Sequence, residues 1–396
     1  MAVLVTNGSD TIDVKGGDNY PIRLIDNTLY IVLINSTNEA IEMYKSTNEG
    51  VSWSLASSNS YNPSISVPYC VANCLGPDGI IYITFNQHKV SGVLTNDGLH
   101  YIPYDPSSDT FGSSSYISSG VNTNILDSYR TVACAISDDI TKQLHTVWKS
   151  ARTTRSLFTE NAYYNRTDVS GGGGGSTNIK LRSFTCPHSV LIEKSNSARR
   201  PIILASNLSN QSPGSVITFE TYTGNTELAT SFSRKAGLST APKLNTYSSN
   251  FNFAEDNEGN HWCIHPEGTP DFNLKYLKHT GTNWTTDYTT GEVTPVSGTL
   301  YLAGPTGSFG YGTTRNDKHF LSRTEISTTG GASYFNDYNK HPQNEWNGPS
   351  SVESSGVSYV RLRWSNYQHY APHIIDYIYE KSGDIYYDQK HLNLHI

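Results

Sequence analysis

A short pattern recurs seven times along this chain at a nearly constant interval, and the repeat constrains the fold more than any other feature. Each copy has an apolar, aromatic-rich run, a turn, and a second run that ends in Asn, Asp, Gly or Ser. The copies are anchored at residues that lie 52 to 63 positions apart, namely Tyr30, Tyr82, His145, Ile203, Trp262, Phe320 and Tyr377. A repeat of this length, rich in short strands and without helical periodicity, predicts one four-stranded blade of a β-propeller per copy.

The first copy contains the four strands that a blade needs. We expect them at residues 21–26, 29–33, 40–45 and 52–57, with turn residues between the first two. In the second copy the same order predicts strands at 67–73, 80–85 and 90–95. The third strands of the later copies are expected at 162–165, 216–221, 274–278, 333–336 and 385–388.

The two ends of the chain complement each other. Only eight residues follow the strand expected at 385–388, so the seventh copy is one strand short. Residues 3–6 precede the first copy and have the composition of a strand. Pairing these ends would close a ring and remove exposed sheet edges. We therefore predict an all-β fold with one domain over residues 1–396, a seven-bladed β-propeller of four-stranded antiparallel blades closed by its N-terminal strand.

The charge and hydropathy of the chain exclude several classes of partner. The formal net charge is −7, the pI is near 6.0, and no basic run occurs, so we expect no nucleic-acid partner. No apolar stretch approaches the ~18 residues that cross a bilayer, so we expect no membrane insertion. The first residues lack the basic start and long apolar core of a signal peptide.

The five cysteines are odd in number and lie mostly in or beside expected strands. Cys70 and Cys74 are four residues apart, but no second pair with zinc-ligand spacing occurs elsewhere. Free cysteines in strands behave as small apolar core residues. We interpret them as structural thiols and expect neither a metal site nor a cofactor.

Two segments with matching turn chemistry are expected to connect third and fourth strands. One is Thr47-Asn48-Glu49-Gly50-Val51-Ser52-Trp53, and the other is Thr95-Asn96-Asp97-Gly98-Leu99-His100-Tyr101. In each, Asn and the acid can accept hydrogen bonds from nearby backbone N–H groups, and Gly can adopt a positive φ. The closing aromatic residue would fill the apolar layer of the blade.

This pattern resembles the Asp-box (BNR) hairpin of the sialidase superfamily, Ser-x-Asp-x-Gly-x-Thr-Trp. Residues 46–53 fit it with Asn48 in the Asp place and Ser52 in the Thr place. The resemblance implies a sialidase-like propeller. Asp-boxes are structural hairpins that lie far from active sites, and they occur in sialidases, propeller polysaccharide lyases, glycan-binding lectins and phage attachment proteins. The motif therefore supports the fold and leaves the chemistry open.

Ligands of propellers bind at the mouth of the central channel, beside the starts of the innermost strands. Candidate catalytic residues at that position are Tyr129, Arg130, His188 and Tyr311. Candidate substrate-binding residues are Tyr20, Arg23, Tyr69, His88, Asn250, Tyr359 and Arg361. Tyr can stack on a sugar ring, and Arg can bind a carboxylate.

Four functional hypotheses remain open at this point. Recognition of a glycan needs only aromatic rings, amides and hydroxyls, which the 27 Tyr and the abundant Asn, Ser and Thr supply. A polysaccharide lyase needs a cation or His to neutralise a uronate and a Tyr or His to remove a proton. A sialidase would need an arginine triad and a Tyr nucleophile with a Glu base, and no acid is obviously placed for that role. A virion propeller without a ligand would be purely structural.

We predict the first function, in a phage or viral attachment component that binds a cell-surface or extracellular polysaccharide. The composition resembles phage fibre and spike proteins. The enzyme hypothesis, a polysaccharide lyase or glycoside hydrolase, is kept as the alternative. Extracellular or virion localisation, and a homo-oligomer or other virion proteins as partners, follow from the same interpretation.

Overall fold

The computed structural model describes most of the strands of this chain. The described residues are 2–7, 10–11, 19–35, 37–61, 67–88, 98–119, 132–137, 142–154, 157–170, 177–183, 185–193, 198–207, 217–241, 253–255, 261–267, 272–279, 284–293, 299–301, 305–309, 318–327, 330–339, 345–363 and 374–391. For part of these strands only the backbone is described. Among the described residues, none belongs to a helix that is long and apolar enough to span a membrane.

The described strands form antiparallel sheets, one of eight strands, two of five and three of four. The first sheet holds β2 (Asp10–Thr11), β3 (Ile22–Arg23), β4 (Leu29–Asn35), β5 (Ala40–Ser46) and β6 (Ser54–Ser60). The second holds β7 (Val67–Leu75), β8 (Ile81–His88), β9 (Gly98–Asp105), β10 (Thr110–Phe111) and β11 (Ser115–Ser119). The third holds β12 (Val132–Ile136), β13 (Gln143–Thr154), β14 (Leu157–Asp168) and β15 (Thr177–Ser183).

The remaining sheets continue in chain order. The fourth holds β16 (Thr185–Ile192), β17 (Pro201–Asn207), β18 (Ile217–Gly224) and β19 (Phe232–Ala241). The fifth holds β20 (Phe253–Glu255), β21 (His261–Glu267), β22 (Phe272–His279) and β23 (Trp284–Val293). The eight-stranded sheet holds β24 (Thr299–Tyr301), β25 (Pro305–Phe309), β26 (Lys318–Ser327), β27 (Gly330–Asn339), β28 (Glu345–Arg363), β29 (Ile374–Lys381), β30 (Asp384–His391) and β1 (Val3–Thr6).

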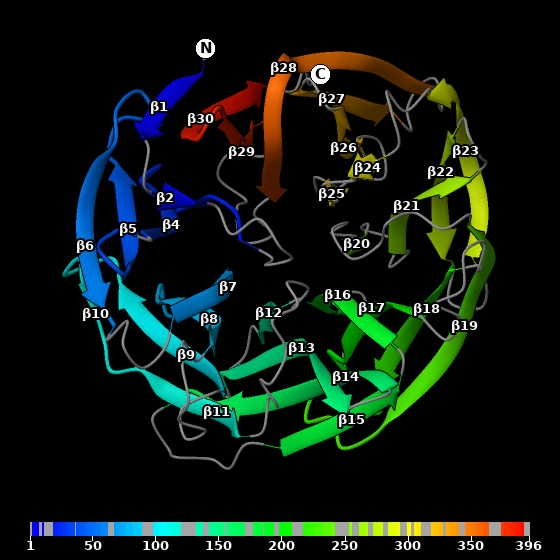
Figure 1. The fold of residues 1–396 in the computed structure, drawn as a ribbon, viewed down its shortest axis with the longest axis horizontal. Coiled ribbons are helices and arrows are strands. Elements are labelled where there is room, and N and C mark those ends of the chain that lie inside the picture. The colour runs from blue at the N-terminus through cyan, green and yellow to red at the C-terminus, as the bar shows by residue number, and fades with distance from the viewer. Residues whose placement is uncertain are drawn as a thin grey trace.

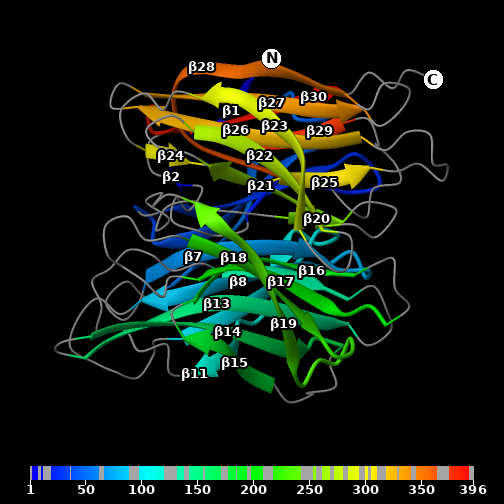
Figure 2. The same ribbon diagram turned by 90° about the vertical axis from the view of Figure 1, so that its right-hand side faces the viewer.

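The sheets follow one another around a ring (Figure 1). Strands β7, β12, β16 and β20 lie nearest the centre, and β6, β15, β19 and β23 lie at the rim (Figure 1). Figure 2 shows the ring from the side, with the rim strands β19 and β23 facing the viewer. Each of the seven sequence anchors lies on a strand that pairs on both sides, namely β4, β8, β13, β17, β21, β26 and β29. The arrangement is that of a propeller-like fold, as the repeat predicts.

The eight-stranded sheet joins the two ends of the chain. The first part of β28 pairs with β27, and its last residues pair with β29. Figure 1 shows β28 turning from the rim toward the centre between these two pairings. At the other edge β1 pairs antiparallel with β30, with Val3 opposite Tyr387, as expected from the missing strand. The division of this sheet into two blades, which would give seven in a closed ring, stays a prediction.

The first expected Asp-box hairpin is confirmed between β5 and β6. Ser46 Oγ accepts a hydrogen bond from Gly50 N at 2.8 Å, and Asn48 Oδ1 accepts one from Ser52 N at 2.9 Å. Gly50 has φ +87°, and Trp53 packs edge-on against Tyr387 of β30 with ring centroids 5.0 Å apart. The hairpin therefore anchors the first sheet to the eight-stranded sheet.

The second expected box is wrong as a connection between third and fourth strands. Gly98–Tyr101 begin β9, which pairs directly with β8 and is therefore the third strand itself. Leu99 packs toward the third sheet and Ile102 toward the first, so this run is buried on both faces. The turn that follows instead lies at residues 106–109. The apolar run at residues 99–104 therefore formed a strand where the Asn-Asp-Gly signal predicted a turn between strands. The strand expected at 90–95 lies outside the described residues.

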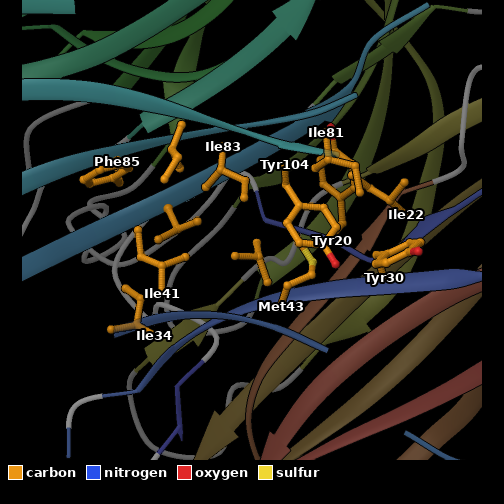
Figure 3. Packing of buried hydrophobic residues seen from close by; sticks show 13 residues of the cluster. Tyr20, Ile22, Tyr30, Ile34, Ile41, Met43, Ile81, Ile83, Phe85 and Tyr104 are labelled. Atoms are coloured by element: carbon orange, nitrogen blue, oxygen red, sulfur yellow. The ribbon is translucent and has the colours of Figure 1, made fainter. Parts of the chain in front are cut away.

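Alternation along each strand explains how neighbouring sheets pack. On β8, Ile81, Ile83 and Phe85 join the core shared with the first sheet, whereas Tyr82 joins the core shared with the third. Figure 3 shows the first of these cores, where Tyr30 and Met43 from the first sheet meet residues of the second. Because successive side chains point to opposite faces, one strand serves two interfaces.

Candidate functional site

The strand registers define two ends of each innermost strand. β7 begins beside the last residue of β8 and ends beside the first. β16 and the last residues of β28 are placed in the same way against β17 and β29. We call the end where innermost strands begin the start end, and the opposite end, which carries the turns to the second strands, the turn end. The Asp-box hairpin of the first sheet also lies at the turn end.

Three innermost strands have an irregular backbone near the start end. The register shifts at Tyr69 in β7, at His188 in β16, and at Ser358, next to Tyr359, in β28. An extra residue of this kind bends its strand and changes the direction of its side chain, and such β-bulges are frequent beside functional sites. β12 contacts both β7 and β16, so two of these irregularities flank one innermost strand.

The structure places the expected site residues unevenly. Strands β7, β8, β16 and β28 hold five of them, whose backbone is described: Tyr69, His88, His188, Tyr359 and Arg361. Four lie outside the described residues: Tyr129, Arg130, Asn250 and Tyr311. Tyr69, His88, His188 and Tyr359 lie in the half of their strands nearer the start end. Their convergence on one point stays a prediction.

Arg23 lies at the turn end and is fully engaged in the protein. Its Nε donates to Asp376 Oδ2 at 2.8 Å, and its Nη2 donates to Asp376 Oδ1 at 2.6 Å. Nη2 also reaches Gln389 Oε1 at 3.1 Å and Tyr387 Oη at 3.4 Å. Burial, the largest single influence, would lower the pKa of Arg23, but the hydrogen bond to Asp376 and the attraction of nearby negative charge together raise it. With 1% of its surface exposed, Arg23 joins the first sheet to the eight-stranded sheet in this structure.

Tyr20 is also buried, at 5% exposure, in the core between the first and second sheets. Asn73 of β7 donates from Nδ2 to Tyr20 O at 2.8 Å and to Asn19 Oδ1 at 2.9 Å. Figure 3 shows the ring of Tyr20 among apolar side chains. The two expected binding residues whose side chains are described thus both contribute to contacts between sheets.

Glu380 is an acid near the start end that sequence reasoning missed. It lies on β29 directly opposite Tyr359 of β28. Directly opposite residues of an antiparallel pair share one face of the sheet, with Cβ atoms about 4.5–5.5 Å apart. Its Oε2 is buried without a hydrogen-bond partner, and burial raises the pKa of the carboxyl group. Only the pairing register brings it beside Tyr359, so residue spacing alone gave no signal.

Unsatisfied polar groups also occur near the start end of the second sheet. Asn86 on β8 is fully buried and both its amide atoms lack a partner, as does the hydroxyl of Thr84 on the same face. Asn86 is the register partner of Cys70, the residue after Tyr69. A buried unpaired amide costs about 1–3 kcal/mol, and such groups in native proteins call for a bound water, an ion or a ligand. The sequence contains no signal for this feature.

The fold resembles solved structures of carbohydrate-active proteins. A Hadza microbial sialidase aligns over 90% of this chain and 74% of its own, with a TM-score of 0.55 and 10% identity. The NanB sialidase from Streptococcus pneumoniae aligns over 99% of this chain and 94% of its own, with a TM-score of 0.52 and 7% identity. A polysaccharide lyase, an ulvan lyase bound to -[GlcA(1-4)Rha3S]-, aligns over 98% and 96%, with a TM-score of 0.52 and 7% identity.

No protein-family model matches this sequence, and no curated protein matches it. At 7–10% identity the structural likeness shows the fold alone. These three structures are two sialidases and a polysaccharide lyase, and the chain shares their propeller-like architecture.

Proposed function

We propose that this chain recognises an extracellular polysaccharide at the start end of its innermost strands. The observation that carries the proposal is the backbone irregularity of β7, β16 and β28 beside Tyr69, His188 and Tyr359. Aromatic and imidazole side chains suit sugar binding because a flat apolar ring stacks on the C–H face of a pyranose while a polar atom hydrogen-bonds its hydroxyls. The likeness to glycan-acting structures supports the same class of ligand.

The direct test measures retention of sialylated glycans and uronic-acid polysaccharides on the immobilised protein. We expect Tyr69→Ala and His188→Ala each to weaken retention at least tenfold. Tyr116→Ala is the matched control, because Tyr116 lies on β11 and is 47% exposed, so its loss should leave retention unchanged. Wild-type retention that survives both start-end substitutions would refute the proposed site.

The alternative function, a polysaccharide lyase or glycoside hydrolase, is favoured by one observation. Glu380 lies opposite Tyr359, and its raised pKa suits a proton-transferring carboxyl group. Together with the expected residues Tyr129, Arg130, His188 and Tyr311, it would supply the acid that the sequence did not place. Elimination would create unsaturated ends that absorb near 235 nm, and hydrolysis would release reducing ends without that absorbance.

The two functions separate in one assay. Turnover that falls at least a hundredfold in Glu380→Gln with retention intact would assign catalysis. Retention without any turnover by the wild type would assign recognition alone. Neither retention nor turnover by the wild type would favour a virion propeller without a ligand.

The particle to which this recognition belongs is a finer proposal. We infer a phage or viral attachment component, exposed on a virion or otherwise outside the cell, in which several copies or other virion proteins assemble. Its support is the composition, rich in Asn, Ser, Thr, Gly and Tyr and poor in Lys, which resembles fibre and spike proteins. The test purifies virions from a culture that produces them and looks for this chain in the particles by mass spectrometry. Its absence from the particles would contradict the proposal.

A further inference from the structure

Two cysteine side chains meet across the interface between the second and third sheets. Cys74 on β7 is 4% exposed and Cys134 on β12 is fully buried. Their sulfur atoms lie 3.6 Å apart, although the residues are 60 positions apart in the chain. Both cysteines are core residues, as expected from the sequence, but the spacing along the chain gave no indication that these two form a pair.

Packing holds the two sulfur atoms together. Both cysteines belong to one apolar cluster. The cluster also contains Ala72, which lies on β7 with Cys74, and Val132, which lies on β12 with Cys134. A disulfide needs an S–S distance of about 2.05 Å and Cβ atoms about 3.5–4.5 Å apart. The sulfur atoms must therefore approach by roughly 1.5 Å, which requires side-chain rotation and a small shift of two neighbouring strands.

We propose that Cys74 and Cys134 form a reversible disulfide that cross-links the innermost strands of the second and third sheets when a peroxide is present. One thiolate attacks an oxygen of hydrogen peroxide, the O–O bond breaks, and a sulfenic acid and a hydroxide form. The hydroxide takes up the thiol proton and becomes water. The second thiol then attacks the sulfenic sulfur, the S–S bond forms, and a second water leaves.

Two thiols are oxidised in this sequence, and one peroxide is reduced to two waters. Hydrogen peroxide is small and uncharged, which allows it to enter a buried site that a larger disulfide reagent reaches slowly. A dithiol reverses the reaction by exchange. The linkage would close a loop in the unfolded chain and fix the separation of β7, which carries the bulge at Tyr69, from β12.

The test treats the purified full chain with hydrogen peroxide, blocks the remaining thiols, and digests the protein without reduction. We expect one linked peptide pair that contains Cys74 and Cys134 and disappears on treatment with dithiothreitol. The denatured protein should show five thiols when reduced and two fewer after oxidation. The melting temperature should rise by roughly 5 °C, because the cross-link restricts the unfolded chain.

Variants provide the control. Cys134→Ser should abolish the linked peptide and the rise in melting temperature, whereas Cys263→Ser, on β21 of the fifth sheet, should retain both. The peptide map of the wild type stands by itself if Cys134→Ser fails to fold. Absence of a 74–134 linkage in the oxidised wild type, or linkage of a different pair, would overturn the proposal.

Discussion

The first sheet contacts two neighbours, and the two contacts are built differently. Toward the second sheet it forms a mainly apolar core around Tyr30, Met43 and Ile81 (Figure 3). Toward the eight-stranded sheet it adds the buried ion pair of Arg23 and Asp376, whose residues are 353 positions apart. We call these the internal seam and the terminal seam. The chain runs from one sheet to the next at both seams, since β1 of the eight-stranded sheet precedes β2 of the first sheet. The terminal seam differs because it also joins side chains from opposite ends of the sequence.

This difference shows how specificity is distributed around the ring. An apolar core tolerates volume-conserving substitutions because its contacts are not directional, whereas a bidentate guanidinium–carboxylate pair accepts one geometry. Gly50 adds a steric constraint, because a Cβ atom at this position would overlap the ring of Tyr387. The terminal seam is therefore the part of the molecule in which single substitutions should have the largest effect on stability.

The largest effect is expected for Asp376→Ala. It leaves the buried guanidinium of Arg23 without its carboxylate and should lower the free energy of unfolding by about 3–5 kcal/mol in urea titrations. Lys142→Ala is the matched control, because the pair of Lys142 with Asp78 is partly exposed and should contribute about 0–1 kcal/mol. Equal losses of unfolding free energy in the two variants would mean that the buried ion pair of the terminal seam stabilises the fold no more than a partly exposed ion pair.

Replacing both Arg23 and Asp376 tests whether the loss in Asp376→Ala comes from the unpaired charge. The double variant Arg23→Met with Asp376→Leu removes both charges together, so it should recover much of the stability lost in Asp376→Ala. A double variant as unstable as the single one would show that the hydrogen bonds to Tyr387 and Gln389 carry the seam instead.

The internal seam should respond to acid through His100. This side chain stacks on Phe85 with ring centroids 5.6 Å apart, its Nε2 is buried without a partner, and burial lowers its pKa to about 4. The ordinary pKa of His is about 6.5, so between pH 6.5 and 4 the unfolded chain binds a proton that the folded chain does not. The contribution of neutral His100 to the free energy of unfolding is fully present above pH 6.5. It falls by up to about 3 kcal/mol as the pH decreases to 4.

His100→Phe removes this titration while keeping an aromatic ring beside Phe85. Its free energy of unfolding should decline less than that of the wild type between pH 6.5 and 4.5, and the raised pKa of Glu380 acts on both proteins alike and cancels in the difference. Asp109 of the same sheet titrates below this pH range. Burial alone would raise its pKa, but hydrogen bonds from Lys45 and Tyr104 bring the pKa below its ordinary value. Parallel curves for variant and wild type would exclude His100 as the acid-sensitive group.

Local patterns in the sequence were enough to predict the strands and the closing pair. Apolar, aromatic-rich runs followed by turns predicted strands at all seven anchors, and the short last copy predicted the pairing of β1 with β30. The candidate site was less predictable because it depends on register. The bulges at Tyr69 and His188 and the position of Glu380 opposite Tyr359 arise from pairing between strands, which residue spacing does not encode. Arg23 was expected to bind substrate because it lies near the start of an expected innermost strand, and residue spacing contains no signal for its partner Asp376, 353 positions away.

A smaller effect on the terminal seam is expected for Gly50→Ala. Gly50 has φ +87°, and its added Cβ would overlap Cε1 of Tyr387, so the Asp-box hairpin must move away from the eight-stranded sheet. We expect a loss of about 1–3 kcal/mol of unfolding free energy from strain and overpacking. Gly79→Ala separates these causes, because Gly79 has a similar φ of +81° but no atom within 4 Å of its added Cβ. Gly79→Ala should therefore show only the conformational cost of about 1 kcal/mol, and the excess in Gly50→Ala measures how tightly the hairpin is seated against Tyr387.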